Sequence, residues 1–169
     1  TSAVRARFAN IWVDLPPGAF LQPTAAGEFA IQHLVRAGLA LEELPTGKRV
    51  IRIADLYAGI GGIGFALATD GAVGGARRHV AMFEDNSAMV GAARAAAGQA
   101  GISVTAEERD LARRPLSPAE LETYDAVIFD PPRAGARKQA EALAVSGVAR
   151  IAAVSCNAAS FAHDARILI

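Results

Sequence analysis

The sequence predicts an α/β fold in which a parallel sheet carries helices on both faces. From residue 49 onward, short apolar runs alternate with helical stretches, a pattern typical of repeated βαβ units. A polar or glycine-rich segment follows each of these runs, and the carboxyl ends of parallel strands meet at one edge of a sheet. The 169 residues, 52% of them apolar, suffice for one domain with a buried core.

Residues 1–48 form the predicted entry to this core, with one strand and one helix. The strand is expected at 3–14, and the Pro-Pro-Gly segment at 16–18 ends it with a turn. Thr24 is a candidate N-cap for the helix, whose apolar residues recur at helical spacing. The Pro-Thr-Gly segment at 45–47 breaks that pattern.

The core domain is expected over 49–169. Ser117 and Pro118 predict the start of a short helix in an otherwise irregular stretch. Longer helices are expected near 62–68, 86–98, 137–145 and 158–168. The apolar runs predict five strands at 50–56, 79–83, 102–105, 126–129 and 149–154.

Composition excludes several classes of protein. Acidic and basic residues number 17 each, so no overall basic field attracts nucleic acid, and any such contact has to be local. A single cysteine forms no internal disulfide, and no secretory signal is recognisable, which predicts a cytoplasmic protein. Arg52 and Asp55 interrupt the most apolar stretch, so no membrane span is expected. We assume a monomer.

The glycine-rich segment Tyr57–Gly64 follows the first strand of the predicted sheet. Gly59, Gly61 and Gly64 match G-x-G-x-x-G between a strand and a helix, where a ligand can approach the backbone. A tight turn with close helix packing explains the same pattern. Glu84 lies about twenty residues further on, where an acid accepts hydrogen bonds from ribose hydroxyls. Together they favour a cofactor that contains adenosine.

Two further features favour S-adenosylmethionine over a nicotinamide dinucleotide. Asp55 precedes the glycines, where a carboxylate suits a cationic amino-acid group and repels a pyrophosphate. The segment Asp130-Pro131-Pro132-Arg133 follows the fourth strand, and its two prolines stiffen a loop that presents Asp130 to the crevice. The alternative is that the prolines only end a strand.

Cys156 follows the fifth strand and is either a small core residue or a reacting group. Ser155 and Asn157 flank it, and polar neighbours of this kind are uncommon in a packed core. A cysteine hydrolase that pairs Cys156 with His163 is disfavoured, because seven helical residues separate the two by about 10 Å along the axis. We therefore treat Cys156 as a candidate nucleophile at the ligand edge.

Five segments of the chain stand in the order and spacing of a known family. They are Phe20-Leu21-Gln22, Asp55 to Gly61, Glu84, Asp130 to Gly135 and Ser155-Cys156-Asn157. Together they resemble the RNA uracil-5-methyltransferases, which make 5-methyluridine in tRNA and in large-subunit ribosomal RNA. The resemblance runs from Phe20 to Arg166, and the proline motif followed by the cysteine motif is its most specific part.

The resemblance implies a Rossmann-like class I S-adenosylmethionine-dependent methyltransferase fold and a set of site residues. Cys156 is the implied nucleophile, and Arg133 and Asn157 are expected on the RNA side of the site. No metal site is expected. The residues implied to bind S-adenosylmethionine are Gln22, Tyr57, Gly59, Gly61, Gly62, Glu84, Asp130 and, less constrained by the motif, Asp110.

The chain departs from the family pattern in several places. Gly62 stands where relatives often carry asparagine, Thr24 stands near another frequent asparagine, and Ala158 replaces the usual proline. The family usually adds an N-terminal RNA-binding barrel, in some members with an iron–sulfur cluster. It also continues with two more strands and a glutamate that acts as the base. We therefore expect a fragment whose sheet lacks its last two strands.

The predicted reaction is methylation of C5 of a uridine, in ribosomal RNA rather than tRNA, through a covalent bond between Cys156 and C6. A thiolate adds to C6, and Arg133 and helix N-termini are expected to favour it. Three alternatives stay open. They are another S-adenosylmethionine-dependent methyltransferase with an amino-group target, a nicotinamide-dependent oxidoreductase, and a fragment that only binds the cofactor.

Overall fold

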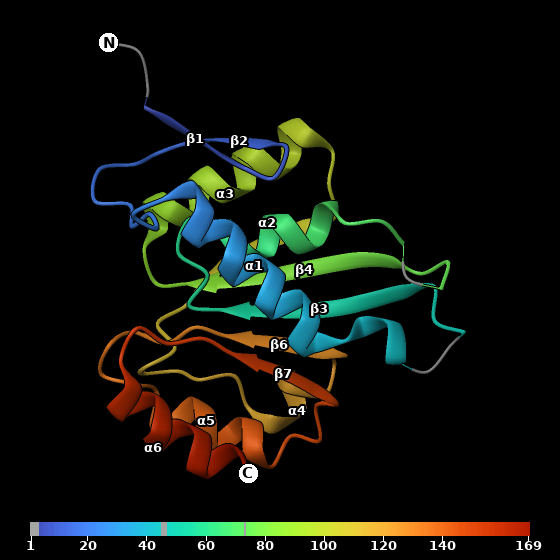
Figure 1. Ribbon diagram of the computed structural model, residues 1–169, viewed down its shortest axis with the longest axis vertical. Coiled ribbons are helices and arrows are strands. Elements are labelled where there is room, and N and C mark those ends of the chain that lie inside the picture. Colours follow the sequence, from blue (N-terminus) through green and yellow to red (C-terminus); the bar gives the residue numbers. More distant parts are fainter. Residues whose placement is uncertain (1–3, 45–46, 73) are drawn as a thin grey trace.

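The computed structural model describes residues 4–44, 47–72 and 74–169, and a five-stranded sheet forms its centre (Figure 1). All neighbouring strands of this sheet pair in parallel, as the alternating sequence pattern predicts. The order across the sheet is β5-β4-β3-β6-β7. The strands are β3 Val50–Leu56, β4 Arg77–Glu84, β5 Val104–Glu108, β6 Ala126–Phe129 and β7 Arg150–Ala153.

The order of these strands reverses beside β3, which lies in the middle of the sheet. The chain steps outward from β3 to β4 and β5, then returns to the other side of β3 for β6 and β7. In sheets of this kind the ligand crevice opens beyond the carboxyl ends of the strands at the reversal. The ends of β3 and β6 therefore mark the expected site.

The N-terminal segment is a hairpin, so the prediction of one continuous strand is wrong. β1 Arg5–Phe8 pairs antiparallel with β2 Ile11–Asp14 through a two-residue turn. Ala9 in this turn has φ of 50°, a left-handed conformation for which glycine or asparagine is the usual signal. An alanine there hides the turn from sequence analysis. Ala3, the first residue of the predicted strand, lies outside the described residues.

The helices begin close to the predicted positions. Thr24 caps the first helix by accepting a hydrogen bond from the Gly27 N–H, as predicted, and Ser117 forms a capping box with Glu120. Pro45 and Thr46 of the predicted helix break lie outside the described residues. No helix in the described ranges combines the length and apolar character that crossing a bilayer requires. The helices are α1 Ala25–Leu39, α2 Gly62–Thr69, α3 Ser87–Ala100, α4 Pro118–Leu121, α5 Arg137–Ala144 and α6 Ala158–Leu168, with a 3-10 turn, η1, at Leu41–Glu43.

Strand β5 lies later in the chain than the predicted 102–105. Gly101 ends α3 in a left-handed conformation, and the Ile102 N–H donates to the Ala97 carbonyl. The helix end therefore uses residues that apolar pattern alone assigns to the strand. The other four strands of the sheet overlap their predicted ranges closely.

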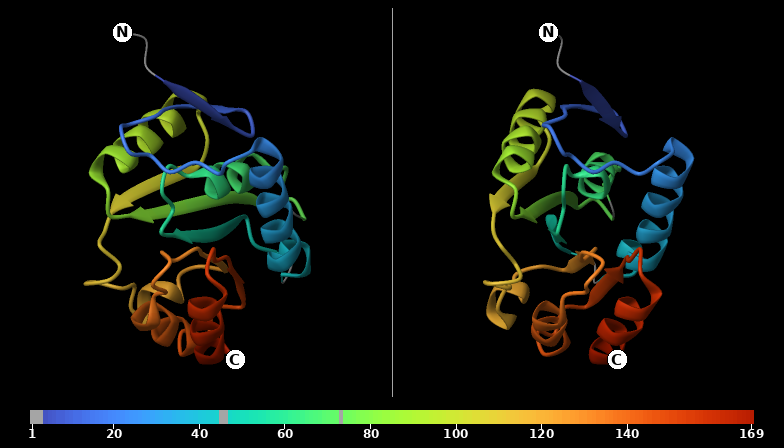
Figure 2. Two further views of the ribbon diagram at one scale, coloured as in Figure 1. Left: turned by 60° about the vertical axis from the view of Figure 1, so that its left-hand side comes forward. Right: turned by 90° about the vertical axis from the view of Figure 1, so that its left-hand side faces the viewer.

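The sheet separates two hydrophobic cores, which follow from the alternation of side chains along each strand. On one face, Ile53 and Ile128 pack with the hairpin, α1, α2 and α3. On the other face, Leu56 and Phe129 pack with α4, α5 and α6. Figure 2 shows the hairpin and α3 on one side of the sheet and α5 and α6 on the other. Helices on both faces confirm the predicted fold class.

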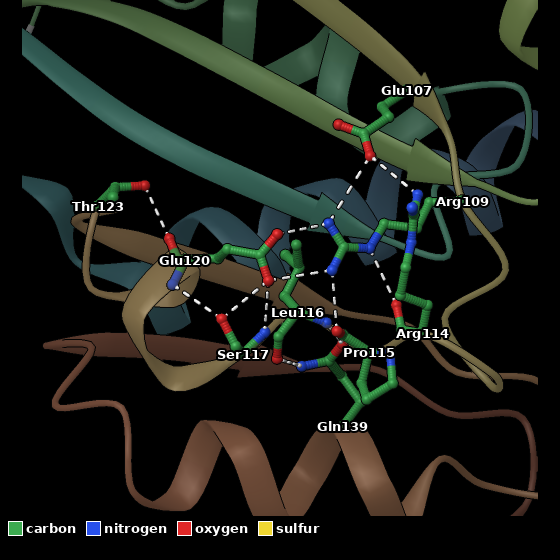
Figure 3. Close-up of polar contacts among 9 residues, drawn as sticks. All are labelled: Glu107, Arg109, Arg114, Pro115, Leu116, Ser117, Glu120, Thr123 and Gln139. Atoms are coloured by element: carbon green, nitrogen blue, oxygen red, sulfur yellow. Dashed lines mark hydrogen bonds and ion pairs between the residues drawn. The ribbon is translucent and has the colours of Figure 1, made fainter.

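A buried arginine orders the segment after β5 (Figure 3). Arg109 donates to both carboxylate oxygens of Glu120, at 2.6 and 3.0 Å, and to the carbonyls of Arg114 and Pro115. The Arg109 hydrogen bond lowers the pKa of Glu120 to about 2. Gln139 of α5 adds two bonds to the Leu116 backbone. Because the Arg109 N–H also donates to the Glu84 carbonyl, this segment is anchored beside the end of β4.

Candidate functional site

A groove opens at the carboxyl ends of β3 and β6, the place that the strand order indicates. Its floor is formed by Asp55 and by the glycine turn, a name we use for residues 57–64. Asp130 borders it from the end of β6, while Glu28 of α1 and Gln22 of the preceding loop close the opposite side. Side chains from four separate parts of the chain therefore converge on one groove.

The glycine turn has a backbone conformation that ordinary side chains disfavour. Tyr57 takes φ of 63° although it has a side chain, and Gly61 takes φ of 92°. Such left-handed non-glycine residues persist where surrounding contacts enforce them, often at ligand sites. A Cβ at Gly61 would lie 2.8 Å from the Phe65 ring, so close packing also requires glycine there. At Gly59 a Cβ would meet nothing within 4 Å, which leaves its surroundings open.

Glu84 ties the glycine turn to the next strand. One oxygen of its carboxylate accepts the Gly59 N–H at 2.9 Å, and the other accepts the Asn86 N–H at 3.0 Å. Burial and then the neighbouring Asp85 raise the pKa of Glu84. A carboxylate oxygen accepts more than one hydrogen bond, so each retains capacity for a ligand hydroxyl.

Two more carboxyl groups lie in the groove with few partners. Asp55 is 2% exposed, and burial, followed by the charge of Asp130, raises its pKa to about 8. Burial and the charge of Glu28 raise the pKa of Asp130 to about 6. Oδ2 of Asp55 is buried without a hydrogen-bond partner among the described residues. The groove therefore gathers carboxyl groups whose ionised forms repel one another, and Oδ2 of Asp55 lacks a hydrogen-bond donor among the described residues.

This arrangement fits a cationic ligand that carries an adenosine group. A positive charge in the groove offsets the repulsion among the carboxyl groups and gives the buried Asp55 oxygen a partner. The glycine turn keeps side chains away from the backbone, and Glu84 provides oxygen acceptors. S-adenosylmethionine has a sulfonium, an ammonium and a ribose, so the residues present match its chemistry. A dinucleotide pyrophosphate meets repulsion here.

The second part of the site is the cysteine corner, defined as Ser155–Asn157 together with the loop 130–133. Cys156 is exposed and immediately precedes the N-cap of α6. Asn157 supplies this cap by accepting from the Ala159 N–H at 3.0 Å, while its amide donates to the Arg133 carbonyl at 3.1 Å. This side chain joins the cysteine segment to the proline motif that carries Asp130.

Comparison with known proteins agrees with this geometry, although no family model matches the chain. An uncharacterized RNA methyltransferase of Mesorhizobium japonicum is 44% identical over 164 residues, which are 96% of this chain and 36% of that protein. The 23S rRNA (uracil(1939)-C(5))-methyltransferase RlmD of Hahella chejuensis is 40% identical over 123 residues, 69% of this chain and 26% of that protein. Among solved structures, the Pyrococcus abyssi tRNA (uracil-54, C5)-methyltransferase, in complex with S-adenosyl-L-homocysteine, matches with a TM-score of 0.74 and 28% identity.

This chain belongs to the RNA uracil-5-methyltransferase family. The structural match covers 99% of this chain and 38% of the Pyrococcus protein. The chain spans about a third of the length of the curated relatives it matches most fully. The resemblance identified from its motifs is therefore confirmed at the level of the family and the fold.

The structure brings most of the family's implied cofactor residues together. Five of them line the groove, while Glu84 and Gly61 are hydrogen-bonded to the groove-lining residues Gly59 and Ala58. Asp110 is placed differently: it follows β5, and its carboxylate accepts the N–H groups of Ala112 and Arg113. The five residues that line the groove are Gln22, Tyr57, Gly59, Gly62 and Asp130.

Of the two residues expected on the RNA side, Arg133 is exposed and Asn157 is half-buried. Asn157 uses its carbonyl for the helix cap and one amide N–H for Arg133, so one N–H remains for a substrate. Across the described residues, no group of three or more His, Cys, Asp or Glu side chains is placed to hold a metal ion.

Sequence analysis missed Glu28 as a member of the groove. Glu28 lies on α1, far from the glycine turn in sequence, and its side chain reaches the groove only because α1 packs on α2. Gln32 donates to the Glu28 carboxylate at 2.9 Å and to the Gly62 carbonyl at 3.0 Å, which links the two helices. In the sequence, the only sign that Glu28 takes part in a site is its spacing of one helical turn from Gln32.

Proposed function

We propose that this chain is the cofactor-binding and nucleophile-bearing part of an enzyme that methylates C5 of a uridine in RNA. The observation that carries the proposal is the cysteine corner. An exposed Cys156 lies on a segment that Asn157 bonds to the loop of Asp130, and Asp130 borders the groove. The names of the relatives add support, because they describe RNA methyltransferases and two uracil-C5 enzymes.

In this proposal S-adenosylmethionine occupies the groove and supplies an electrophilic methyl group when bound. Glu84 would accept hydrogen bonds from the ribose hydroxyls, and Asp55 and Asp130 would favour the cationic end of the molecule. Gln22 and Tyr57 line the groove wall, with Gly59, Gly61 and Gly62 providing an open backbone surface. These residues would bind and orient the cofactor, and the glycines leave room for it because they carry no side chains.

Cys156 acts on the base. Uracil C5 is a weak nucleophile, so the ring needs activation before it can accept a methyl group. The Cys156 sulfur adds to C6, which forms a C–S bond and moves negative charge toward C5. After C5 gains the methyl group, a base removes the C5 proton, the C5–C6 double bond re-forms and the thiolate leaves. Arg133 is exposed on the loop that Asn157 bonds to the cysteine segment, where its charge is available to an RNA phosphate.

A uridine in ribosomal RNA is the proposed target. The relative named for 23S ribosomal RNA is 40% identical over 69% of this chain, and the structure named for tRNA is 28% identical over 99% of it. In either RNA the base has to leave its stack to meet Cys156, which costs a few kcal/mol when it is paired. We further propose that the protein is cytoplasmic and monomeric. We also propose that the chain consists of an entry segment, 1–48, and a core domain, 49–169.

The test is a covalent trap with the whole protein. RNA that carries 5-fluorouridine at the target site is incubated with S-adenosylmethionine, and the mixture is run on a denaturing gel. Because fluorine at C5 cannot leave as a cation, the base step stalls and the C–S bond to Cys156 persists. Retarded protein–RNA bands are expected for the wild type and are absent for Cys156→Ala.

The same experiment separates the alternatives. A methyltransferase with an amino-group target leaves no covalent band, and such a result would end the uridine proposal. Calorimetry with S-adenosylmethionine and with NAD separates both methyltransferases from a nicotinamide-dependent oxidoreductase. Binding of NAD alone contradicts the assignment of the groove.

A further inference from the structure

We infer that Glu28, together with Asp130, makes the groove select the positively charged methyl donor over its neutral by-product. This inference rests on the proposed function, since it concerns the same groove, and it assigns a specificity role to a residue outside the motifs. Glu28 is a positioning and specificity residue here, while Cys156 remains the nucleophile.

The first observation is that Glu28 occupies the space that Gly62 leaves free. A Cβ on Gly62 would lie 2.6 Å from the Glu28 carboxylate, a distance that real Cβ atoms essentially never show. Gln32 holds the pair together by donating to both the Glu28 carboxylate and the Gly62 carbonyl. The absent side chain at 62 and the carboxylate from α1 therefore form one complementary contact at the groove wall.

The second, independent observation is the unpartnered oxygen of Asp55. This side chain is almost fully buried on the groove floor, and its Oδ2 has no hydrogen-bond partner among the described residues. A buried carboxyl oxygen without a partner costs free energy, which a ligand atom recovers when it binds. Glu28 and Asp130 add negative charge to the same groove. The groove thus offers a cation the carboxylates of Glu28 and Asp130, and it offers a ligand atom the unpartnered oxygen of Asp55.

Methyl transfer changes the charge of the ligand in a way that this groove can sense. The sulfonium of S-adenosylmethionine is positive, and loss of its methyl group leaves the neutral thioether of S-adenosylhomocysteine. The ammonium, carboxylate and adenosine groups are common to both molecules. In this inference the sulfur lies within reach of the Glu28 carboxylate in the groove. That carboxylate then favours the donor over the by-product, and the by-product is released more readily after the reaction.

The experiment measures dissociation constants of both ligands by calorimetry, for the wild-type chain and for Glu28→Gln. The amide keeps the shape of the side chain and can still accept a bond from Gln32, but it removes the charge. The expected result is that the preference for S-adenosylmethionine over S-adenosylhomocysteine falls about five- to tenfold. Structural damage alone weakens both ligands together and leaves this ratio unchanged.

Two further variants complete the design. Glu42→Gln removes the same charge at the exposed 3-10 turn and is expected to leave the ratio as in the wild type. Gly62→Ala pushes the Glu28 carboxylate aside without changing its charge, so a smaller fall in the ratio is expected. If Glu28→Gln loses affinity equally for both ligands, or loses none, this inference is overturned while the proposed cofactor stands. A wild-type chain that binds neither ligand overturns both.

Discussion

The glycine turn and the cysteine corner serve one groove, yet different bonds hold them in place. Backbone hydrogen bonds and the Glu84 carboxylate tie the glycine turn to β4, and the neighbouring Asp55 is buried. The cysteine corner is exposed at Cys156 and is joined to the proline motif by the Asn157 amide. Cofactor binding and attack on the base should therefore respond to different substitutions.

The strongest way to sharpen this contrast is Cys156→Ala. The sulfur forms the bond on which the reaction depends, so methylation of RNA is expected to fall by about 10³-fold or more. Cys156 lies outside the groove lining, and affinity for S-adenosylmethionine is expected to stay within a few-fold. Methyl transfer to RNA by the whole protein and calorimetry measure the two quantities. Residual methylation near the wild-type rate would falsify the covalent route.

The buried carboxyl of Asp55 offers a test on the side of the glycine turn, through pH. Its pKa is about 8 in the folded chain against an ordinary value of 3.8, so the folded state binds the extra proton between these values. The free energy of unfolding then falls as pH rises through this window, by up to about 1.4 kcal/mol per pH unit. Asp55→Asn removes this contribution and is expected to flatten the pH dependence.

Urea unfolding of the ligand-free chain at pH 5, 6, 7 and 8 measures the effect. Asp130, whose pKa is raised to about 6, remains in the variant and accounts for a residual slope at the acidic end. Identical slopes above pH 6 in the wild type and Asp55→Asn contradict a protonated Asp55. Weaker binding of S-adenosylmethionine by the variant is expected alongside.

Glu84→Gln is expected to loosen the glycine turn and to weaken cofactor binding, with a smaller effect than the loss of methylation in Cys156→Ala. The amide replaces one acceptor oxygen by an NH₂ group, which faces the N–H of either Gly59 or Asn86 and cannot accept from it. A lost bond to a charged group costs about 1.5–3 kcal/mol, so the dissociation constant for the cofactor should rise about 10- to 150-fold. Calorimetry with adenosine and with S-adenosylmethionine should show the same factor, since Glu84 serves the ribose. A loss of affinity for S-adenosylmethionine without a loss of affinity for adenosine contradicts this role.

The part of the site that local sequence determines was predictable. A strand followed by glycines, or by two prolines, restricts the backbone within a few residues, so the positions of Gly61 and Asp130 follow from the motif itself. Strand β3 and helix α6 match their predicted ranges, because their apolar spacing is regular and turn or cap residues bound them. Parallel pairing then brings the strand ends to one edge.

The features that long-range packing determines were not predictable. Glu28 enters the groove only because α1 lies against α2, and Asp110 turns toward its own loop because nearby N–H groups need an acceptor. The hairpin turn depends on the left-handed conformation of Ala9, which an alanine does not signal. In each case a tertiary contact or a local hydrogen bond decides the outcome, and neither alters the apolar periodicity of the sequence.

The smallest expected effect concerns the bond that joins the two parts of the cysteine corner. Asn157→Ala removes the N-cap of α6 and the bond to the Arg133 carbonyl, and loss of a cap costs about 1 kcal/mol. Ser117→Ala is the matched control, because it removes the cap of α4 at a distance from the groove. Both variants should lower the unfolding midpoint by a similar amount. Only Asn157→Ala should slow methylation, by several-fold with unchanged cofactor affinity, since the sulfur loses its fixed relation to the Asp130 loop. Equal rates in the two variants show that the amide bridge serves stability alone.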